Sequence, residues 1–195
     1  MPRPETTQRI PGAGRLWALV LLVCLCALPS RAIAADAAAL EYKVKAGYLF
    51  NFAKFIEWPA ASAPKTNSPL VIGILDGGEA FPVVKPLLDG KTVDGRVVQV
   101  KAVTADQVGS GLHILLVTRA AGKTPEEIRI ALGSAATLLV GETDRFAELG
   151  GMMGFTREED SVRLTLNLER ATEAGLKVSS KLAGVAKLVK SKRGN

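Results

Sequence analysis

Five short apolar segments, set apart by turn-forming and helix-forming residues, constrain the fold of this chain more than any other feature. Segments 70–75 (LVIGIL) and 114–118 (ILLVT) are continuously apolar, as strands covered on both faces are. Segments 96–103 (RVVQVKAV) and 162–168 (VRLTLNL) alternate between apolar and polar residues, which is typical of more exposed strands. Together with segment 136–140 (ATLLV), they predict the strands of a sheet.

Helix-forming stretches between these strands indicate the fold class. They are residues 80–88, 125–132 and 144–149. Thr124 and Glu127 give the second stretch a capping box, with Pro125 in its first turn, whereas Pro82 and Pro86 weaken the first. Strands that alternate with helices predict a single layered α/β domain, whose mixed, mostly parallel sheet has about five to six strands flanked by helices.

Both ends of the domain are predicted to be helices packed on the sheet. Residues 38–57 have a helical apolar stripe, and Pro59 ends the helix. Near the C-terminus, residues 152–155 and 162–168 predict an antiparallel hairpin. A short helix then starts at Asn167 or Glu169 and stops at Gly175. Ser179 or Ser180 caps a last helix, whose predicted buried stripe is Leu182, Val185, Ala186 and Val189.

Residues 1–34 have the anatomy of a secretory signal peptide. Basic residues precede the 13-residue apolar run at 16–28, and the small-residue triplet 32–34 (AIA) follows it. A retained membrane anchor is disfavoured, because a span needs ~20 apolar residues. No twin-arginine pair is present, so we expect the general secretion route, cleavage after Ala34 and a periplasmic protein. Cys24 and Cys26 leave with the leader, so the mature chain has no thiol for a disulfide or a nucleophile.

The charge of the mature chain does not indicate a nucleic-acid partner. Removal of four arginines and one glutamate with the leader reduces the formal net charge from +6 to +3. Much of the remaining excess is near the end, in Lys187, Lys190, Lys192 and Arg193, and no basic cluster on one face is evident. We interpret residues 191–195 as a basic, frayed tail, with contact to anionic lipid as the less favoured alternative.

The residues that could carry chemistry do not form a recognisable catalytic or metal-binding set. His113, the single histidine, directly precedes an apolar strand. One histidine with scattered serines does not establish an acid–base or nucleophilic site, so a structural histidine is favoured over a hydrolase. Because zinc sites need three or four Cys, His or carboxylate ligands, no metal and no cofactor is expected, and the chain is predicted not to be an enzyme.

Two further groups leave a ligand-binding role open. Gly77 and Gly78 follow segment 70–75 without a phosphate-binding motif, so a positive-φ turn is favoured over a ligand pocket at the carboxyl ends of the strands. Five charged residues lie near predicted strand ends, and surface ion pairs are favoured for them over a paired-carboxylate site. They are Glu142, Asp144, Arg145, Glu148 and Arg163.

Aromatic residues are concentrated in the N-terminal helix and suggest a surface for a partner. Six of the ten aromatic residues lie between Tyr42 and Trp58. On a helical projection most of them, with Glu41, Val44 and Lys45, share the side of Phe52 that should face the core. Phe50 lies on the opposite side, near Lys43 and Lys54, and exposed aromatics beside cations are typical of interface anchors. We predict partner-binding residues Phe50, Lys54 and Trp58; the alternative is that another element, such as the C-terminal helix, covers Phe50.

The assembled motifs resemble the YfiR/HmsC-like family of exported proteins. The run EYKVKAGYLFNFAKFIEWP (residues 41–59) resembles the opening helix of that family. VIGIL, GKTVDGRVVQV, HILLV and the closing run from LLVGETDRFAELGGMMGF onward match in order, so the resemblance covers about residues 39–190. The predicted organisation is therefore a signal peptide at 1–34, a YfiR-like domain at 35–190 and a tail at 191–195.

The resemblance implies a periplasmic repressor rather than an enzyme. Such a protein binds the periplasmic sensor domain of an inner-membrane diguanylate cyclase and holds it inactive, which limits cyclic-di-GMP and biofilm matrix. It implies a dimer-prone chain, and the partner is expected to be a diguanylate cyclase or a sensor kinase. Family members often have Cys-His where this chain has Leu112-His113, so control through disulfides does not carry over. A small-molecule-binding periplasmic sensor module is the alternative function.

Overall fold

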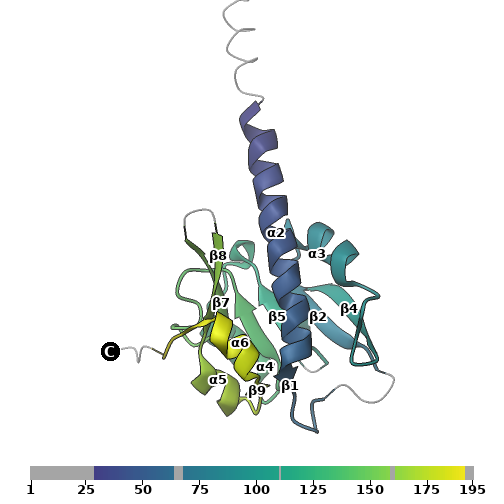
Figure 1. Cartoon of the computed structure of the whole chain (residues 1–195), viewed down its shortest axis with the longest axis vertical. Helices are drawn as coiled ribbons and strands as arrows, with labels where there is room; N and C mark the ends of the chain where they lie inside the picture. The colour runs from purple at the N-terminus through teal and green to yellow at the C-terminus, as the bar shows by residue number, and fades with distance from the viewer. Residues whose placement is uncertain (1–28, 64–67, 110, 159–160, 192–195) are drawn as a thin grey trace, which may run out of the picture. The chain divides into compact units, whose positions relative to one another are not determined.

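The computed structural model describes residues 29–63, 68–109, 111–158 and 161–191. The chain divides into two compact units, residues 1–38 and 39–195. Helix α2 (Pro29–Phe55) begins in the first unit, and the sheet with the remaining helices belongs to the second (Figure 1). No helix of the described ranges is long and apolar enough to cross a membrane. Most of the predicted signal peptide and tail residues 192–195 lie outside the described residues, so export and cleavage stay predictions.

An eight-stranded sheet forms the centre of residues 39–195, in the order β10-β8-β7-β6-β5-β2-β4-β3. Strands β4, β2, β5, β6 and β7 run parallel to one another, whereas β8 and β3 are antiparallel to β7 and β4. The strands are β2 (Leu70–Leu75), β3 (Thr92–Val93), β4 (Arg96–Val103), β5 (Ile114–Val117), β6 (Leu138–Gly141), β7 (Met153–Glu158), β8 (Ser161–Leu166) and β10 (Lys187–Leu188). The α/β fold and the mixed, mostly parallel sheet are confirmed; the two-residue strands β3 and β10 raise the strand number above the expected five to six.

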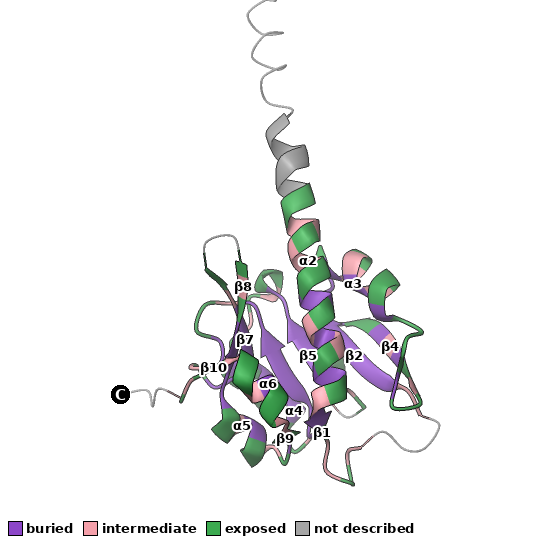
Figure 2. Ribbon diagram, in the orientation of Figure 1, coloured by how far each residue is buried: buried purple, intermediate pink, exposed green. Residues whose placement is uncertain are grey.

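Burial along the strands follows the sequence pattern. Strands β2, β5 and β6 are buried at every position, because elements cover both faces of the central sheet. Strand β4 alternates more, and Val97 on it is 52% exposed. Figure 2 shows this gradient, with buried central strands and exposed residues on the helices and the hairpin.

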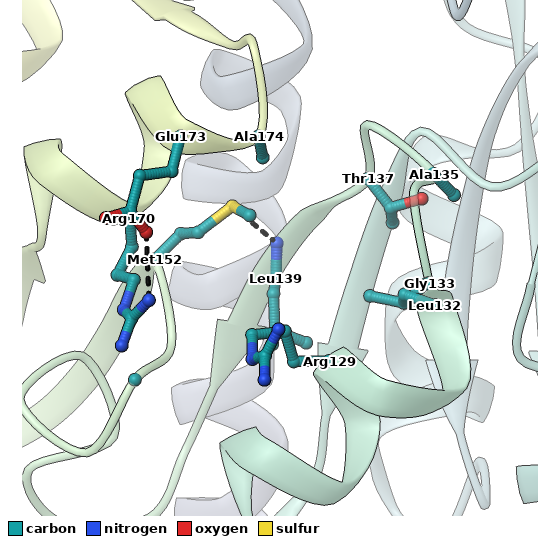
Figure 3. Close-up of a pocket in the computed structure, with 11 residues that line it drawn as sticks. Arg129, Leu132, Gly133, Ala135, Thr137, Leu139, Met152, Arg170, Glu173 and Ala174 are labelled. Carbon is teal, nitrogen blue, oxygen red and sulfur yellow. Dashed lines mark hydrogen bonds and ion pairs between the residues drawn. The ribbon is translucent and has the colours of Figure 1, made fainter.

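Helices cover both faces of the sheet. The helices after α2 are α3 (Ala80–Leu88), α4 (Pro125–Leu132), α5 (Leu168–Glu173) and α6 (Ser180–Val185), with short 3₁₀ turns η1 (Ala105–Gln107) and η2 (Arg119–Ala121). The chain moves from β2 to β4 in one direction and from β5 to β6 in the other, so right-handed crossovers place α3 and α4 on opposite faces. The part of α2 within the second unit, residues 39–55, lies on the face opposite α4 (Figures 1 and 3).

Capping chemistry explains where the shorter helices begin. Thr124 accepts a hydrogen bond from the backbone N–H of Glu127, and the Glu127 carboxylate accepts one from the backbone N–H of Thr124, which completes the predicted capping box. The side chains of Asn167 and Ser179 cap α5 and α6 by accepting a hydrogen bond from the backbone N–H of Arg170 and of Leu182, without a reciprocal bond. The predicted starts of all three helices are thus confirmed.

Two predicted helical segments are wrong. Residues 144–149 form turns rather than a helix, since Arg145 has a left-handed φ of 59° that an α-helix does not accommodate. The last helix ends at Val185, because Ala186 is extended and residues 187–188 pair with β8 as β10. Of its predicted buried stripe only Leu182 is buried, and Val185 is 69% exposed.

The N-terminal helix provides much of the aromatic core. Phe52 is fully buried, and its ring lies 6.1 Å from that of Phe155 on β7, centroid to centroid. The Tyr48 ring lies 5.8 Å from the same Phe155 ring, a separation at which aromatic pairs attract. After α2, the chain forms the two-residue strand β1 (Ile56–Glu57), which pairs with β9 (Lys177–Val178) and ties the two ends of the domain together.

Side chains protect the outer edge of β4 beyond its short pairing with β3. The carboxylate of Asp89 accepts a hydrogen bond of 2.7 Å from the backbone N–H of Val100, and the Lys85 ammonium donates to the Val100 carbonyl at 3.3 Å. The hydrogen bond from Val100, followed by that from Lys85, keeps the pKa of Asp89 below its usual value. The edge is therefore blocked by the chain's own side chains.

Candidate functional site

The structure brings two of the three predicted partner-binding residues together and separates the third. Lys54 is exposed, and its ammonium lies 4.5 Å from the centre of the half-buried Phe50 ring. Lys91, which precedes β3, places its ammonium 5.7 Å from the same ring. Phe50 also packs against the core. The segment that leads into β3 therefore helps to cover its ring, through Lys91. Partner binding by these residues remains a prediction.

Trp58 has a structural role beyond the end of α2. It is half-buried, and its indole N–H donates to the carbonyl oxygen of His113 at 3.2 Å. Its ring meets the His113 ring edge-on at 5.9 Å. Trp58 thus attaches the segment after α2 to the start of β5.

An exposed stripe runs along the outer side of α2, which we call the outer face of α2. Its residues recur every three or four positions and therefore share one side of the helix: Leu40, Val44, Gly47, Asn51 and Lys54. Leu40 is 62% and Val44 44% exposed, so the prediction that Val44 faces the core is wrong. A Cβ at Gly47 would meet no heavy atom within 4 Å. Nothing within the described chain therefore requires a glycine there.

A buried charge cluster occupies the carboxyl end of β6. The Lys45 ammonium, from α2, lies 2.9 Å from the carboxylate of Glu142, and both side chains are almost fully buried. The same carboxylate accepts hydrogen bonds from the Tyr42 hydroxyl at 3.3 Å and the Arg119 backbone N–H at 3.1 Å. Burial, followed by the charge of Glu142, raises the pKa of Tyr42.

This cluster corrects the expectation of a surface ion pair for Glu142. Glu142 is not part of a surface ion pair, although Arg145–Glu148 and Arg163–Glu158 are such pairs. Open α/β sheets usually bind ligands at the carboxyl ends of their strands, but here Lys45, Tyr42 and Glu142 fill that position by pairing with one another. Gly77 and Gly78 have φ values of 53° and 48°, which confirms the positive-φ turn favoured for them.

His113 is buried, and one of its ring nitrogens accepts a hydrogen bond from the backbone. Its Nδ1 accepts a hydrogen bond of 3.0 Å from the backbone N–H of Val71, so the neutral ring fits the site. Burial, with a smaller contribution from the charge of Arg96, lowers the pKa of His113 below its ordinary 6.5. This geometry agrees with the structural role favoured from the sequence. Among the described residues, no group of three or more His, Cys, Asp and Glu side chains is arranged to hold a metal ion.

We expect acid to destabilise the fold through His113. The unfolded chain takes up a proton near pH 6.5, whereas the folded chain takes it up only at lower pH. Stability should therefore fall as the pH drops below about 6.5 and stop falling below the folded pKa. Urea unfolding at pH 7.5 and 5.5 measures the loss. Because the sequence has one histidine, its NMR ring signals report the folded pKa directly. A value at or above 6.5 would contradict the prediction.

A pocket of about 140 Å³ lies at the opposite end of the strands from the charge cluster (Figure 3). Thr137 and Leu139 line it at the amino end of β6, and Met152 lines it just before β7. Arginines from α4 and α5 complete its wall. No local sequence pattern predicts this pocket, because its residues come from three stretches, 129–139, 150–152 and 170–174, that only the fold brings together.

No curated protein matches the chain. A crystal structure of a conserved domain protein from Vibrio cholerae O1 biovar El Tor str. N16961 is similar at 11% identity and a TM-score of 0.44. The similarity covers 62% of this chain and 55% of that one, so the chain spans about half the length of that structure. The family model described as YfiR/HmsC-like matches residues 42–187, well over half of the 195 residues, and the chain therefore belongs to the YfiR/HmsC-like family.

Proposed function

We propose that this chain is a periplasmic regulatory protein that binds and represses the periplasmic sensor domain of an inner-membrane signalling protein. A diguanylate cyclase is the proposed partner, so that the chain limits cyclic-di-GMP and biofilm formation; a sensor kinase is the other candidate. Membership in the YfiR/HmsC-like family, which is regulatory and non-catalytic, supports this proposal. The signal peptide predicted at residues 1–34 supports a periplasmic location. We propose no enzymatic activity and no cofactor.

The observation that carries the proposal is the outer face of α2. Exposed Leu40 and Val44 lie on the same side as Gly47, where the absence of a side chain lets another backbone approach closely. A glycine inside a helix destabilises it by roughly 0.5–1 kcal/mol relative to alanine. No close contact within the fold requires a glycine here, because a Cβ at Gly47 would meet nothing within 4 Å. A partner helix lying against this face supplies a reason for the glycine.

Charge around this face indicates the character of the partner. Lys43, Lys54 and Lys91 are exposed, and in the described ranges none of them forms an ion pair. Lys54 and Lys91 instead lie against the Phe50 ring. An acidic segment of the partner beside its apolar anchor would complement these cations. A second copy of the chain, which lacks a clear excess of acid on this face, fits less well.

The proposal predicts that Val44→Asp weakens partner binding. An aspartate at this position places an unpaired charge in the centre of the apolar contact, which should weaken binding at least about tenfold. The measurement is the affinity of the purified variant for the periplasmic domain of a candidate inner-membrane diguanylate cyclase from the same organism, together with cyclic-di-GMP levels in a deletion strain that expresses the variant. We expect loss of repression together with loss of binding.

Ile130→Asp is the matched control. Ile130 is an exposed aliphatic residue (68%) on α4, the helix on the opposite face of the sheet, so this variant should bind and repress normally. Equal behaviour of the two variants, or normal cyclic-di-GMP levels in the deletion strain, would contradict the proposal.

A further inference from the structure

The pocket between α4 and α5 combines an apolar floor with a charged rim. Leu132, Leu139 and Met152 supply the floor, and the thioether sulfur of Met152 accepts a hydrogen bond from the Leu139 backbone N–H at 3.5 Å. Small residues, including Ala135 and Ala174, line the sides and leave the space open. At about 140 Å³ the pocket is below the usual 300–1,000 Å³ of sites for drug-sized ligands. Its ligand would be small.

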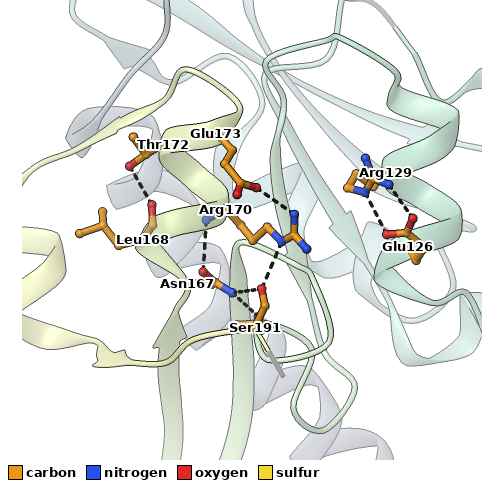
Figure 4. A network of polar contacts seen from close by, with 9 residues as sticks. Glu126, Arg129, Asn167, Leu168, Arg170, Thr172, Glu173 and Ser191 are labelled. Carbon is orange, nitrogen blue, oxygen red and sulfur yellow. Dashed lines mark hydrogen bonds and ion pairs between the residues drawn. The ribbon is translucent and has the colours of Figure 1, made fainter. Parts of the chain in front are cut away.

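Two arginines from different helices form the rim of this pocket. Arg129 on α4 donates through Nε and Nη2 to the carboxylate of Glu126. Arg170 on α5 donates through Nη1 to Glu173 at 2.8 Å and through Nε to the Ser191 hydroxyl at 3.1 Å. Figure 4 shows the Arg129 guanidinium next to Glu126 and the Arg170 guanidinium next to Glu173, and Figure 3 shows both arginines among the pocket's lining residues.

The rim retains hydrogen-bonding capacity for a ligand. Nη1 of Arg129 and Nη2 of Arg170 have no protein acceptor among the described residues, and each carries N–H donors. The ion pairs to Glu126 and Glu173 are solvent-exposed, so they contribute little to stability and are readily shared or exchanged. The pKa of Arg129 is raised, first by its hydrogen bond to Glu126 and most weakly by the charge of Glu173.

From this geometry we propose that the pocket binds a small monocarboxylate with a short apolar body. The carboxylate would lie between Arg129 and Arg170, which present planar, charged donors suited to its two oxygens. The apolar body would lie on Leu132, Leu139 and Met152. This proposal is independent of the protein partner, and it gives the alternative role, a small-molecule sensor, a defined site and ligand class.

Binding at this pocket would also reach the C-terminal segment. The Ser191 hydroxyl accepts hydrogen bonds from both Arg170 and the Asn167 amide. Asn167 in turn caps α5 and donates to the Ala147 carbonyl at 2.9 Å. A carboxylate that draws Arg170 toward the pocket therefore competes with Ser191 for the guanidinium and loosens the attachment of the segment after β10.

NMR titration of the full mature chain with sodium butyrate tests the proposal. Butyrate should shift the amide signals of residues that line the pocket, such as Gly133, Gly150 and Ala174, and that of Ser191. Butylamine and 1-butanol, which have the same apolar body without the carboxylate, should not. Arg129→Gln and Arg170→Gln should each weaken butyrate binding about tenfold or more, because each removes a charge-assisted hydrogen bond.

Two further variants separate a site from a general effect of charge. Arg163→Gln removes an exposed arginine that is paired with Glu158 on the hairpin, and it should leave the affinity unchanged. Ala174→Leu fills the pocket without changing charge and should abolish binding. The proposal would be overturned if butyrate caused no shift at the pocket or still bound to Ala174→Leu. Equal binding of 1-butanol or of inorganic phosphate would also overturn it, as would an equal loss of butyrate binding in Arg163→Gln.

Discussion

Replacing Lys45 with methionine is expected to lower the free energy of unfolding by about 3–5 kcal/mol, because it leaves the Glu142 carboxylate buried without its counter-ion. Lys45 and Glu142 are 3% and 2% exposed, so water cannot solvate the remaining charge. The hydrogen bonds from Tyr42 and from the Arg119 backbone compensate only in part. Chemical denaturation of the mature protein near pH 7.5 measures the loss.

Two variants test whether the loss comes from the unpaired charge. Lys43→Met changes an exposed lysine on the same helix and should alter stability by no more than about 0.5 kcal/mol. The double variant Lys45→Met with Glu142→Met removes the buried pair and should recover most of the stability, since an apolar pair of similar volume often replaces a buried ion pair without loss. Glu41, which also pairs with Lys45, is 23% exposed and lies 3.8 Å from Arg157, so it keeps solvent and a cation nearby. A double variant as unstable as Lys45→Met would contradict this account.

Gly141→Ala and Gly151→Ala should each destabilise the fold by roughly 3 kcal/mol or more, because they displace a fully buried aromatic ring. The Phe146 ring lies between these glycines. A Cβ at Gly141 would come within 2.2 Å of the ring, and one at Gly151 within 2.3 Å of it and 2.9 Å of the Phe146 carbonyl oxygen. Neither glycine has a positive φ, so the expected effect is purely steric. Thermal unfolding of the two variants measures it.

Gly47→Ala is the matched control for these substitutions and should have the opposite sign. A Cβ at Gly47 meets nothing within 4 Å, and alanine is the better helix former, so stability should rise by about 0.5–1 kcal/mol. If all three alanines changed stability alike, the contact with Phe146 would not be the cause.

Periodicity predicted the elements of the fold better than their ends. Segments 70–75 and 96–103 became strands with the expected bounds, and Thr124 with Glu127 located the start of α4. The turn at residues 144–149 was missed because its conformation depends on the Phe146 ring packing between Gly141 and Gly151, a contact that helical periodicity does not report. Strand β10 was missed because pairing with β8, rather than local preference, ends α6.

The candidate sites were harder to predict from the sequence than the elements of the fold. A helical projection placed Lys45 correctly on the inner side of α2, but only the fold brings Glu142 to it across 97 positions. Leu40, Val44 and Gly47 could have been recognised by their helical spacing and by a glycine in mid-helix. The projection instead grouped Val44 with the core. The arginines around the pocket are 41 positions apart in the sequence, and no local pattern links Arg129 to Arg170.

The hydrogen bonds of Asp89 and Lys85 to the backbone of Val100 have a consequence for how this protein assembles. A foreign strand seeking to extend the sheet beside β4 would first have to displace a carboxylate and an ammonium from the backbone groups they occupy. These hydrogen bonds therefore oppose polymerisation through main-chain pairing at the outer edge of β4. A molecule that binds at the outer edge of β4 must therefore contact side chains rather than the main chain. Side-chain contacts distinguish one partner from another, whereas main-chain pairing does so much less.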